Sequence, residues 1–176
     1  MVPSDPTGGG GVRGGRPKLG GRGTLTRPSR PEAPAAAARR PVEVAKKRVL
    51  FVCIGNSCRS QMAEAFAKAY GADIMDVESA GVAPATMIAP LTRQTLAEKN
   101  LRIDDHFPKG METVSRLPFD VIVNMSGSPL KIPGARVLDW SVQDPIGMSE
   151  NVYRTVAAQI EGLVMRLILD LRNAPR

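Results

Sequence analysis

The sequence predicts an α/β domain on a parallel β-sheet, preceded by a segment that cannot form a core. After residue 45, short β-branched runs alternate with stretches of strong helix formers, a pattern typical of parallel strands joined by right-handed helical crossovers. Residues 1–45 are rich in Gly, Pro and Arg and contain no aromatic residue, so they bury too little apolar surface to offset the entropy of ordering. We therefore expect a disordered tail over 1–45 and a folded domain over 46–176.

The first half of the domain predicts strand, helix and strand. An apolar run over 48–52 favours a strand. The residues that follow, 61–69, are mostly helix formers, and Gly71 is a suitable C-terminal stop for a helix reaching about residue 70. A second strand is expected over 74–79, followed by an uncharged loop over 80–89.

The second half predicts three helices and two strands. Pro at position 90 suits the first turn of a helix over 90–100, and a short helix is expected over 111–117. The β-branched run 119–125 predicts a buried strand, and 135–138 a fourth strand. The last helix begins after Ser149, a reasonable N-cap. Its apolar face is formed by Tyr153, Val156, Ile160, Leu163, Leu167 and Leu171.

The loop between the first strand and the first helix contains the candidate catalytic residues. Five residues separate Cys53 from Arg59, and both Gly55 and Asn56 within them tolerate positive φ. A strand that feeds such a loop into a helix turns backbone N–H groups toward one point, where the helix dipole adds positive potential. That concavity suits a tetrahedral oxyanion. A cysteine at its rim is favoured as a thiolate, and the planar guanidinium of an arginine can bind two oxygens of the anion. The alternative is a buried structural cysteine beside an ordinary surface arginine.

The run from Cys53 to Ser60 resembles the Cys-x5-Arg-Ser signature of the low-molecular-weight protein tyrosine phosphatases. Continued through Ala65, it is equally similar to the thioredoxin-coupled arsenate reductases, which share that fold. The resemblance extends over about residues 47–173, including Glu-Ser-Ala-Gly at 78–81 and Asp-Pro at 144–145. It implies a four-stranded sheet in the order 2-1-3-4 with helices on both faces. It also implies catalysis without a metal or any other cofactor.

The resemblance also implies roles for individual residues. Cys53 is the expected nucleophile, Arg59 the anion clamp, and Asp144, stiffened by Pro145, the general acid and base. The alternative for Asp144 is an Asp-Pro turn starter. The expected phosphate-binding residues are Ile54, Gly55, Asn56, Ser57, Cys58, Arg59 and Ser60.

Further residues are expected to support the loop. The Ser60 hydroxyl is placed to donate to the Cys53 thiolate, to act as a helix N-cap, or both. Asn56 and Ser79 resemble the family's residues that hold the loop in shape. Cys58 is either a redox partner that forms a reversible disulfide with Cys53 or a small packing residue.

Two departures from the resemblance bear on the reaction. Phosphotyrosine-directed members carry aromatic side chains in the loop that here spans 82–89, and just after Asp-Pro, where this chain has Ile146. Neither place holds an aromatic residue here, so a ring for stacking on phosphotyrosine is missing. This absence favours arsenate reduction. The three-cysteine reductases instead carry two cysteines after the third strand, whereas residues 124–132 contain none. Only Cys58 or an external thiol could then resolve an adduct on Cys53.

Three hypotheses for function follow. The main one is a metal-independent phosphomonoester hydrolase of the protein tyrosine phosphatase type, which acts through a cysteinyl-phosphate. Its substrate is expected to be a phosphorylated small molecule or a phosphoprotein. The first alternative is an arsenate reductase that uses the same cysteine with an external thiol reductant. The second is a non-catalytic oxyanion-binding module.

Charge and composition limit the partners. The chain has a net charge of +7, but residues 1–45 hold eight basic and three acidic residues, so most of the excess lies in the tail. The tail is either a basic arm or a solvated extension without function; the lack of aromatic residues for base stacking disfavours nucleic acid. No apolar stretch is long enough to span a membrane, and a working thiolate suits a reducing cytoplasm. The single histidine, His106, is expected at the surface rather than on a metal.

Overall fold

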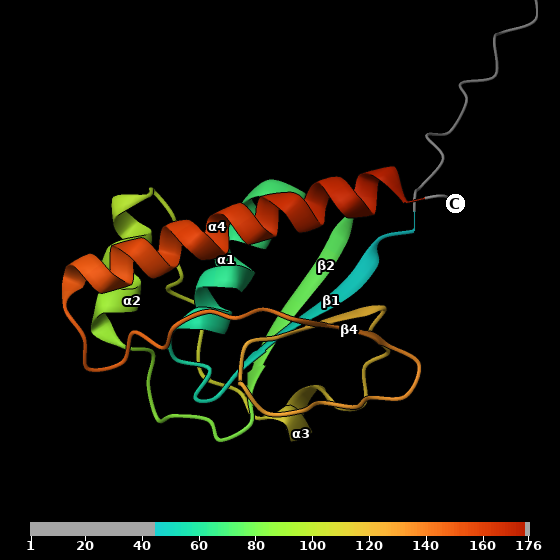
Figure 1. The fold of residues 1–176 in the computed structure, drawn as a ribbon, viewed down its shortest axis with the longest axis horizontal. Helices are drawn as coiled ribbons and strands as arrows, with labels where there is room; N and C mark the ends of the chain where they lie inside the picture. Colours follow the sequence, from blue (N-terminus) through green and yellow to red (C-terminus); the bar gives the residue numbers. More distant parts are fainter. Residues whose placement is uncertain (1–44, 175–176) are drawn as a thin grey trace, which may run out of the picture. The chain divides into compact units, whose positions relative to one another are not determined.

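The computed structural model describes residues 45–174, so the expected tail lies outside it apart from residue 45. It contains one parallel sheet in the order β2-β1-β3-β4, as the resemblance implied (Figure 1). The strands are β1 (Lys47–Cys53), β2 (Met75–Gly81), β3 (Val121–Asn124) and β4 (Arg136–Asp139). The helices are α1 (Arg59–Gly71), α2 (Pro90–Glu98), α3 (Met111–Val114) and α4 (Glu150–Asn173).

Helices cover both faces of the sheet, as expected. Figure 1 shows α1 and α4 on one face and the short α3 on the other. Because side chains alternate along a strand, Val49 and Phe51 of β1 belong to the core cluster that contains residues of α1 and α4. Leu50 and Val52 belong to a second, smaller cluster with Val114 of α3. The central strand is therefore buried on both sides, which fixes the position of the loop that follows it.

The long C-terminal helix packs through the face that its sequence predicts. Tyr153, Val156, Ile160 and Leu167 are buried, and the other two residues of the predicted face are partly buried against the same core. Ser149 lies at the N-cap position, but its side chain makes no capping hydrogen bond. Its carbonyl oxygen instead accepts the backbone N–H groups of residues 152 and 153.

Strand β2 ends two residues later than predicted because its register pairs Gly81 with Cys53 at the end of β1. A Cβ atom at Gly81 would lie 2.6 Å from the carbonyl oxygen of Ile54 and 2.8 Å from the nitrogen of Asn56. The end of β2 thus runs directly against the loop after β1. Elsewhere the predicted helices over 90–100 and 111–117 end earlier, at Glu98 and Val114, and the third strand is shorter at both ends.

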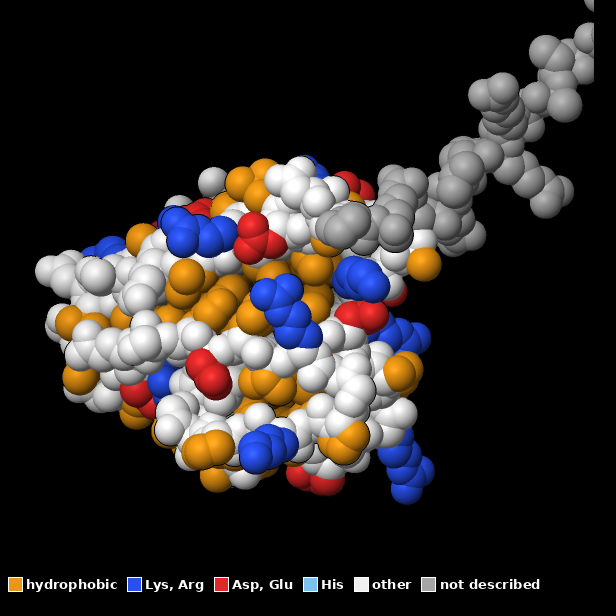
Figure 2. Space-filling view, turned by 45° about the vertical axis from the view of Figure 1, so that its right-hand side comes forward, with side chains coloured by type: hydrophobic (Ala, Val, Ile, Leu, Met, Phe, Trp, Pro, Cys, Tyr) orange, Lys and Arg blue, Asp and Glu red, His pale blue; other side chains and the backbone are white. Residues whose placement is uncertain are grey.

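The surface of the domain mixes charges of both signs. On the face in Figure 2, Lys and Arg side chains are interspersed with Asp and Glu around a central band of hydrophobic side chains. This fits the small charge excess of the sequence after residue 45. In the described part of the chain, no helix combines the length and apolarity needed to cross a bilayer.

Candidate active site

The loop between β1 and α1 presents a row of unused hydrogen-bond donors. Among residues 45–174, no acceptor is found for the backbone N–H groups of residues 54–58. Five N–H groups without a protein acceptor, gathered just ahead of a helix, are suited to bind an anion. Asn56 has φ 49°, in the left-handed region that asparagine tolerates, whereas Gly55 does not adopt a positive φ.

The cysteine at the start of the loop lies at the bottom of a cavity of about 260 Å³. Cys53 is 3% exposed. Its Sγ atom lies 2.9 Å from the Ser60 hydroxyl. Since Asn56 Nδ2 donates to Ser60 Oγ at 2.8 Å, the serine hydrogen is free to point at the sulfur. A hydroxyl that donates to sulfur stabilises the thiolate over the thiol.

Arg59 anchors the opposite side of the cavity. Its Nη1 donates to the carbonyl oxygens of Met125, at 2.8 Å, and Val142, at 3.2 Å. Its Nη2 forms an ion pair with Asp144 Oδ2 at 2.6 Å. Its buried Nε has no hydrogen-bond partner. The guanidinium is therefore held by the loops after β3 and β4, and its Nε remains an unpaired donor.

Asp144 stands at the cavity wall with its carboxylate partly open to solvent. Its side chain is 39% exposed, and its Oδ1 accepts the Ile146 N–H at 3.3 Å. The Pro145 carbonyl accepts the Met148 N–H at 2.9 Å, which closes a turn ahead of α4. The structure thus places Cys53, Arg59 and Asp144, predicted from far-apart parts of the sequence, around one cavity.

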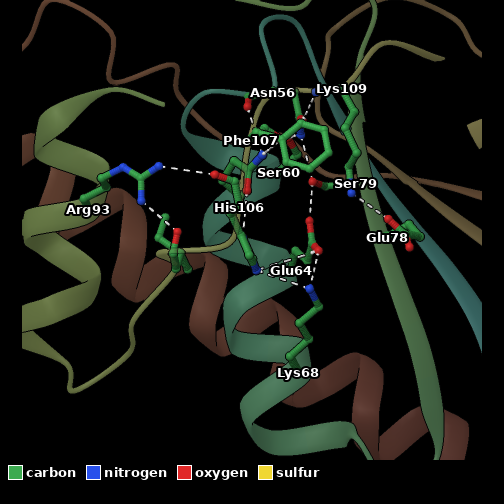
Figure 3. A network of polar contacts seen from close by, with 12 residues as sticks. Asn56, Ser60, Glu64, Lys68, Glu78, Ser79, Arg93, His106, Phe107 and Lys109 are labelled. Atoms are coloured by element: carbon green, nitrogen blue, oxygen red, sulfur yellow. Dashed lines mark hydrogen bonds and ion pairs between the residues drawn. The ribbon is translucent and has the colours of Figure 1, made fainter. Parts of the chain in front are cut away.

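A buried network behind the loop fixes Asn56 (Figure 3). Asn56 Nδ2 donates to Ser79 Oγ at 2.8 Å as well as to Ser60. Ser79 in turn donates to the carboxylate of Glu64, which is 2% exposed. The Asn56 Oδ1 accepts the backbone N–H of Lys109 at 2.7 Å. The expected contacts of Ser60, Asn56 and Ser79 with the loop are therefore present.

The same network buries the side chain of His106, which sequence reasoning placed at the surface. Its ring is 6% exposed, and Nδ1 donates to Gln61 Oε1 at 2.9 Å. Gln61 Nε2 donates to Asn56 Oδ1 at 3.0 Å. Burial lowers the pKa of His106, so the neutral ring is favoured and its Nε2 accepts from Lys68 Nζ at 3.2 Å. The surface expectation failed because the polar partners needed to bury a histidine come from α1.

Cys58 lines the same cavity as Cys53 but points into the core as well. It is 3% exposed, and its Sγ lies 3.5 Å from the Tyr153 hydroxyl on α4. Burial raises the pKa of the Cys58 thiol, and the hydrogen bond with Tyr153 partly opposes that rise. Both cysteines are free.

The rim of the cavity is apolar and carries no aromatic ring. Ile54 is 44% exposed and Ile146 is 54% exposed, and Ala85 completes this side. The loop over 82–89 is fixed to the anion-binding loop over 53–60, here called the cradle, by backbone hydrogen bonds, including Ala85 N–H to Gly55 O at 2.9 Å. The cavity therefore offers no ring for stacking on a phosphotyrosine.

Several contacts of the site were not anticipated from the sequence. Gln61, Glu64 and Tyr153 lie on helices whose patterns predicted only packing, and no local signal marks them as polar partners of the loop. A glutamate in the Ala-rich α1 is the nearest to such a signal. Among residues 45–174 no cluster of three or more His, Cys, Asp or Glu is suited to hold a metal ion.

Comparison with known proteins gives the family. Residues 48–175 match the model of the low molecular weight phosphotyrosine protein phosphatases. A glutaredoxin arsenate reductase of Synechocystis sp. is 35% identical over 130 residues, which cover 71% of this chain and 98% of that protein. Arsenate reductase 1 of Bacillus cereus is 32% identical over 120 residues, covering 65% of this chain and 89% of that protein.

Solved structures include both activities. An arsenate reductase in the phosphate binding state aligns with TM-score 0.65 and 34% identity, over 71% of this chain and 98% of that one. A low molecular weight protein tyrosine phosphatase from T. tengcongensis aligns with TM-score 0.60 and 29% identity, over 71% of this chain and 99% of that one. The fold, the cysteine loop and these matches together show that the chain belongs to the low molecular weight phosphotyrosine protein phosphatase family, which includes relatives named arsenate reductases.

Proposed function

We propose that this protein is an arsenate reductase whose cysteine loop binds the oxyanion and whose electrons come from an external thiol. The observation that carries the proposal is the set of unpaired donors around Cys53: the N–H groups of residues 54–58 and Arg59 Nε. A tetrahedral oxyanion satisfies such donors, and a nucleophilic sulfur lies at the bottom of the same cavity. Arsenate and phosphate share this shape, so anion binding alone does not choose between reduction and hydrolysis.

Two findings favour reduction over the phosphatase activity that was the main expectation from sequence. The curated relatives cited above are named arsenate reductases. The residues that line the cavity include no aromatic side chain, and Ile146 occupies the position after Asp-Pro. Phosphotyrosine binding would lack its usual stacking partner, whereas a small inorganic oxyanion needs none.

The proposed reaction begins with attack of the Cys53 thiolate on arsenic. The loop N–H groups and Arg59 neutralise the charge of the oxyanion, and the Ser60 hydroxyl lies 2.9 Å from the attacking sulfur. Asp144 gives a proton to the departing oxygen, which leaves as water. A thiol then attacks the Cys53 sulfur: an S–S bond forms, the S–As bond breaks, and its electron pair reduces As(V) to arsenite. A second thiol reduces the disulfide and restores Cys53.

Phosphomonoester hydrolysis is the second candidate, since Asp144 stands in the same cavity as Cys53. A cysteinyl-phosphate needs only a water activated by this carboxylate to be released. The two reactions therefore use the same residues through the attack of Cys53 on the bound anion. They differ in whether water or a thiol then resolves the Cys53 adduct.

The test assays both reactions on the purified full chain in the presence of a chelator. We expect sustained arsenite formation, beyond one arsenite per chain, with glutathione, mycothiol or a glutaredoxin-type protein as reductant, and not with thioredoxin alone. Aryl phosphate hydrolysis is expected to be slower than arsenate reduction. Hydrolysis without arsenite formation under any reductant would replace the proposal with the phosphatase. The absence of both activities would favour a non-catalytic oxyanion-binding module.

A further inference from the structure

The second cysteine of the chain has contacts that the proposed reaction does not yet use. Cys58 lines the cavity of about 260 Å³ together with Cys53, and each residue is 3% exposed. These are the only two cysteines in the sequence. The loop after β3, which lacks cysteine, is instead tied by Asn124, whose Oδ1 accepts from the Ser126 hydroxyl at 2.7 Å and whose Nδ2 donates to the Ser128 carbonyl at 2.8 Å. It contains no thiol that could act on an adduct.

On the basis of the proposed function, we infer that Cys58 is the thiol that resolves the arsenic adduct on Cys53, and that Tyr153 is its positioning residue. The Cys58 sulfur attacks the Cys53 sulfur, forming an S–S bond while the S–As bond breaks. The electron pair of that bond stays on arsenic, which leaves as arsenite. The proton of the Cys58 thiol passes to an oxygen of the departing arsenite. Both cysteines are oxidised, and an external thiol then reduces the disulfide.

The surroundings of Cys58 favour a thiol that stays protonated until the arsenic adduct on Cys53 has formed. Burial raises the pKa of Cys58, so it stays protonated and does not compete with Cys53 for the oxyanion. Once arsenic is bound, the Cys53 sulfur becomes the electrophile, and a neighbouring sulfur in the same cavity can attack it. The hydrogen bond with Tyr153 lowers the pKa of Cys58 against the effect of burial and so assists that attack.

Tyr153 contacts this sulfur from α4. It is 3% exposed on α4, and its hydroxyl lies 3.5 Å from Cys58 Sγ. Burial raises the pKa of the Tyr153 phenol, so the hydroxyl remains a donor at neutral pH. A phenol that donates to Cys58 favours the thiolate that must form in the attack.

The experiment is a single turnover of the reduced full chain with arsenate and no added thiol. We expect about one arsenite per chain, loss of both free thiols, and a monomer whose mass falls by two hydrogen atoms. Cys58→Ser should release no arsenite until glutathione or a glutaredoxin-type protein is added, and that rescue also shows that the variant is folded. Wild-type protein that makes arsenite only with external thiol would overturn the inference and leave the proposed function standing. No arsenite under any condition would instead overturn the proposed function, and the inference with it.

Tyr153→Phe tests the positioning role with the ring retained. We expect arsenite release in the single turnover to slow roughly five-fold at neutral pH, the scale of one hydrogen bond, and its pH profile to shift upward. Tyr70→Phe is the matched control, since the Tyr70 hydroxyl bonds Glu161 at the surface and not the site. An unchanged pH profile in Tyr153→Phe would overturn the role of Tyr153, whatever the variant does to stability.

Discussion

The Nη2 atom of Arg59 lies 2.6 Å from Oδ2 of Asp144, so the expected anion clamp and the expected proton donor form one ion pair. An oxyanion that binds in the loop competes with this carboxylate for the guanidinium. The contact also holds Asp144 at the wall of the cavity that Cys53 lines.

The first prediction concerns Asp144→Asn. An amide cannot give a proton to the departing oxygen, so turnover should fall roughly 10²–10⁴-fold. Binding of inorganic phosphate should be kept or become tighter, because the amide no longer neutralises Arg59. Steady-state kinetics and phosphate inhibition constants measure the two effects. A fall in phosphate affinity that matches the fall in turnover would show that Asp144 only holds Arg59 in place.

A second prediction concerns the hydrogen bond between Ser60 and the Cys53 sulfur. Ser60→Ala removes a donor to a charged group, so alkylation of Cys53 by iodoacetamide should slow roughly ten- to hundred-fold at neutral pH. Ser115→Ala is the control, since the Ser115 hydroxyl bonds an exposed carbonyl in α3. Because Cys58 could also react, the alkylated residue is identified by peptide mass. Equal rates in the two variants would mean that Ser60 acts only as an acceptor for Asn56; it does not cap α1, whose N-cap residue is Cys58.

The third prediction uses the close approach of Gly81 to the loop. A Cβ in Gly81→Ala would meet backbone atoms of Ile54 and Asn56, so the loop must shift. We expect a loss of roughly 1–3 kcal/mol in the free energy of unfolding and weaker phosphate binding. The control is Gly162→Ala on α4, where nothing lies within 4 Å and helix propensity should add about 0.5–1 kcal/mol. Unchanged phosphate affinity in Gly81→Ala would contradict a rigid cradle.

The fourth prediction concerns pH and the single histidine. The pKa of His106 is lowered in the folded protein by burial, so the unfolded chain binds a proton that the folded chain resists. His106 therefore costs stability as the pH falls through the ordinary histidine value of about 6.5. NMR titration of His106, the only histidine in the sequence, should give a pKa below that value. Between about pH 8 and 5.5, the melting temperature of His106→Gln should fall less than that of wild type.

Local sequence patterns predicted the strand–loop–helix unit and marked three residues, Cys53, Arg59 and Asp144, that the structure places around one cavity. The β-branched run before Cys53 and the helix formers after Arg59 predict the strand–loop–helix unit. The Asp-Pro pair marks Asp144 even though it lies far along the chain. The sheet order came from the resemblance alone, since periodicity does not say which strands are neighbours.

The parts that sequence reasoning missed depend on long-range packing. The burial of His106 requires Gln61 from α1 to receive its Nδ1 hydrogen, and the environment of Cys58 requires Tyr153 from α4. Their spacings in the sequence predict only helix faces or loops. Polar contacts between separate elements have no local pattern, so they emerge only once the helices are packed on the sheet.

The most direct test of the central claim is arsenite formation by wild-type protein and Cys53→Ser, with glutathione and a glutaredoxin-type protein as reductants. The account predicts sustained arsenite formation by wild type, competitive inhibition by inorganic phosphate, and complete loss in Cys53→Ser. Full arsenate reduction by Cys53→Ser, or reduction that phosphate does not inhibit, would contradict the assignment of the Cys53 loop as the site of reaction.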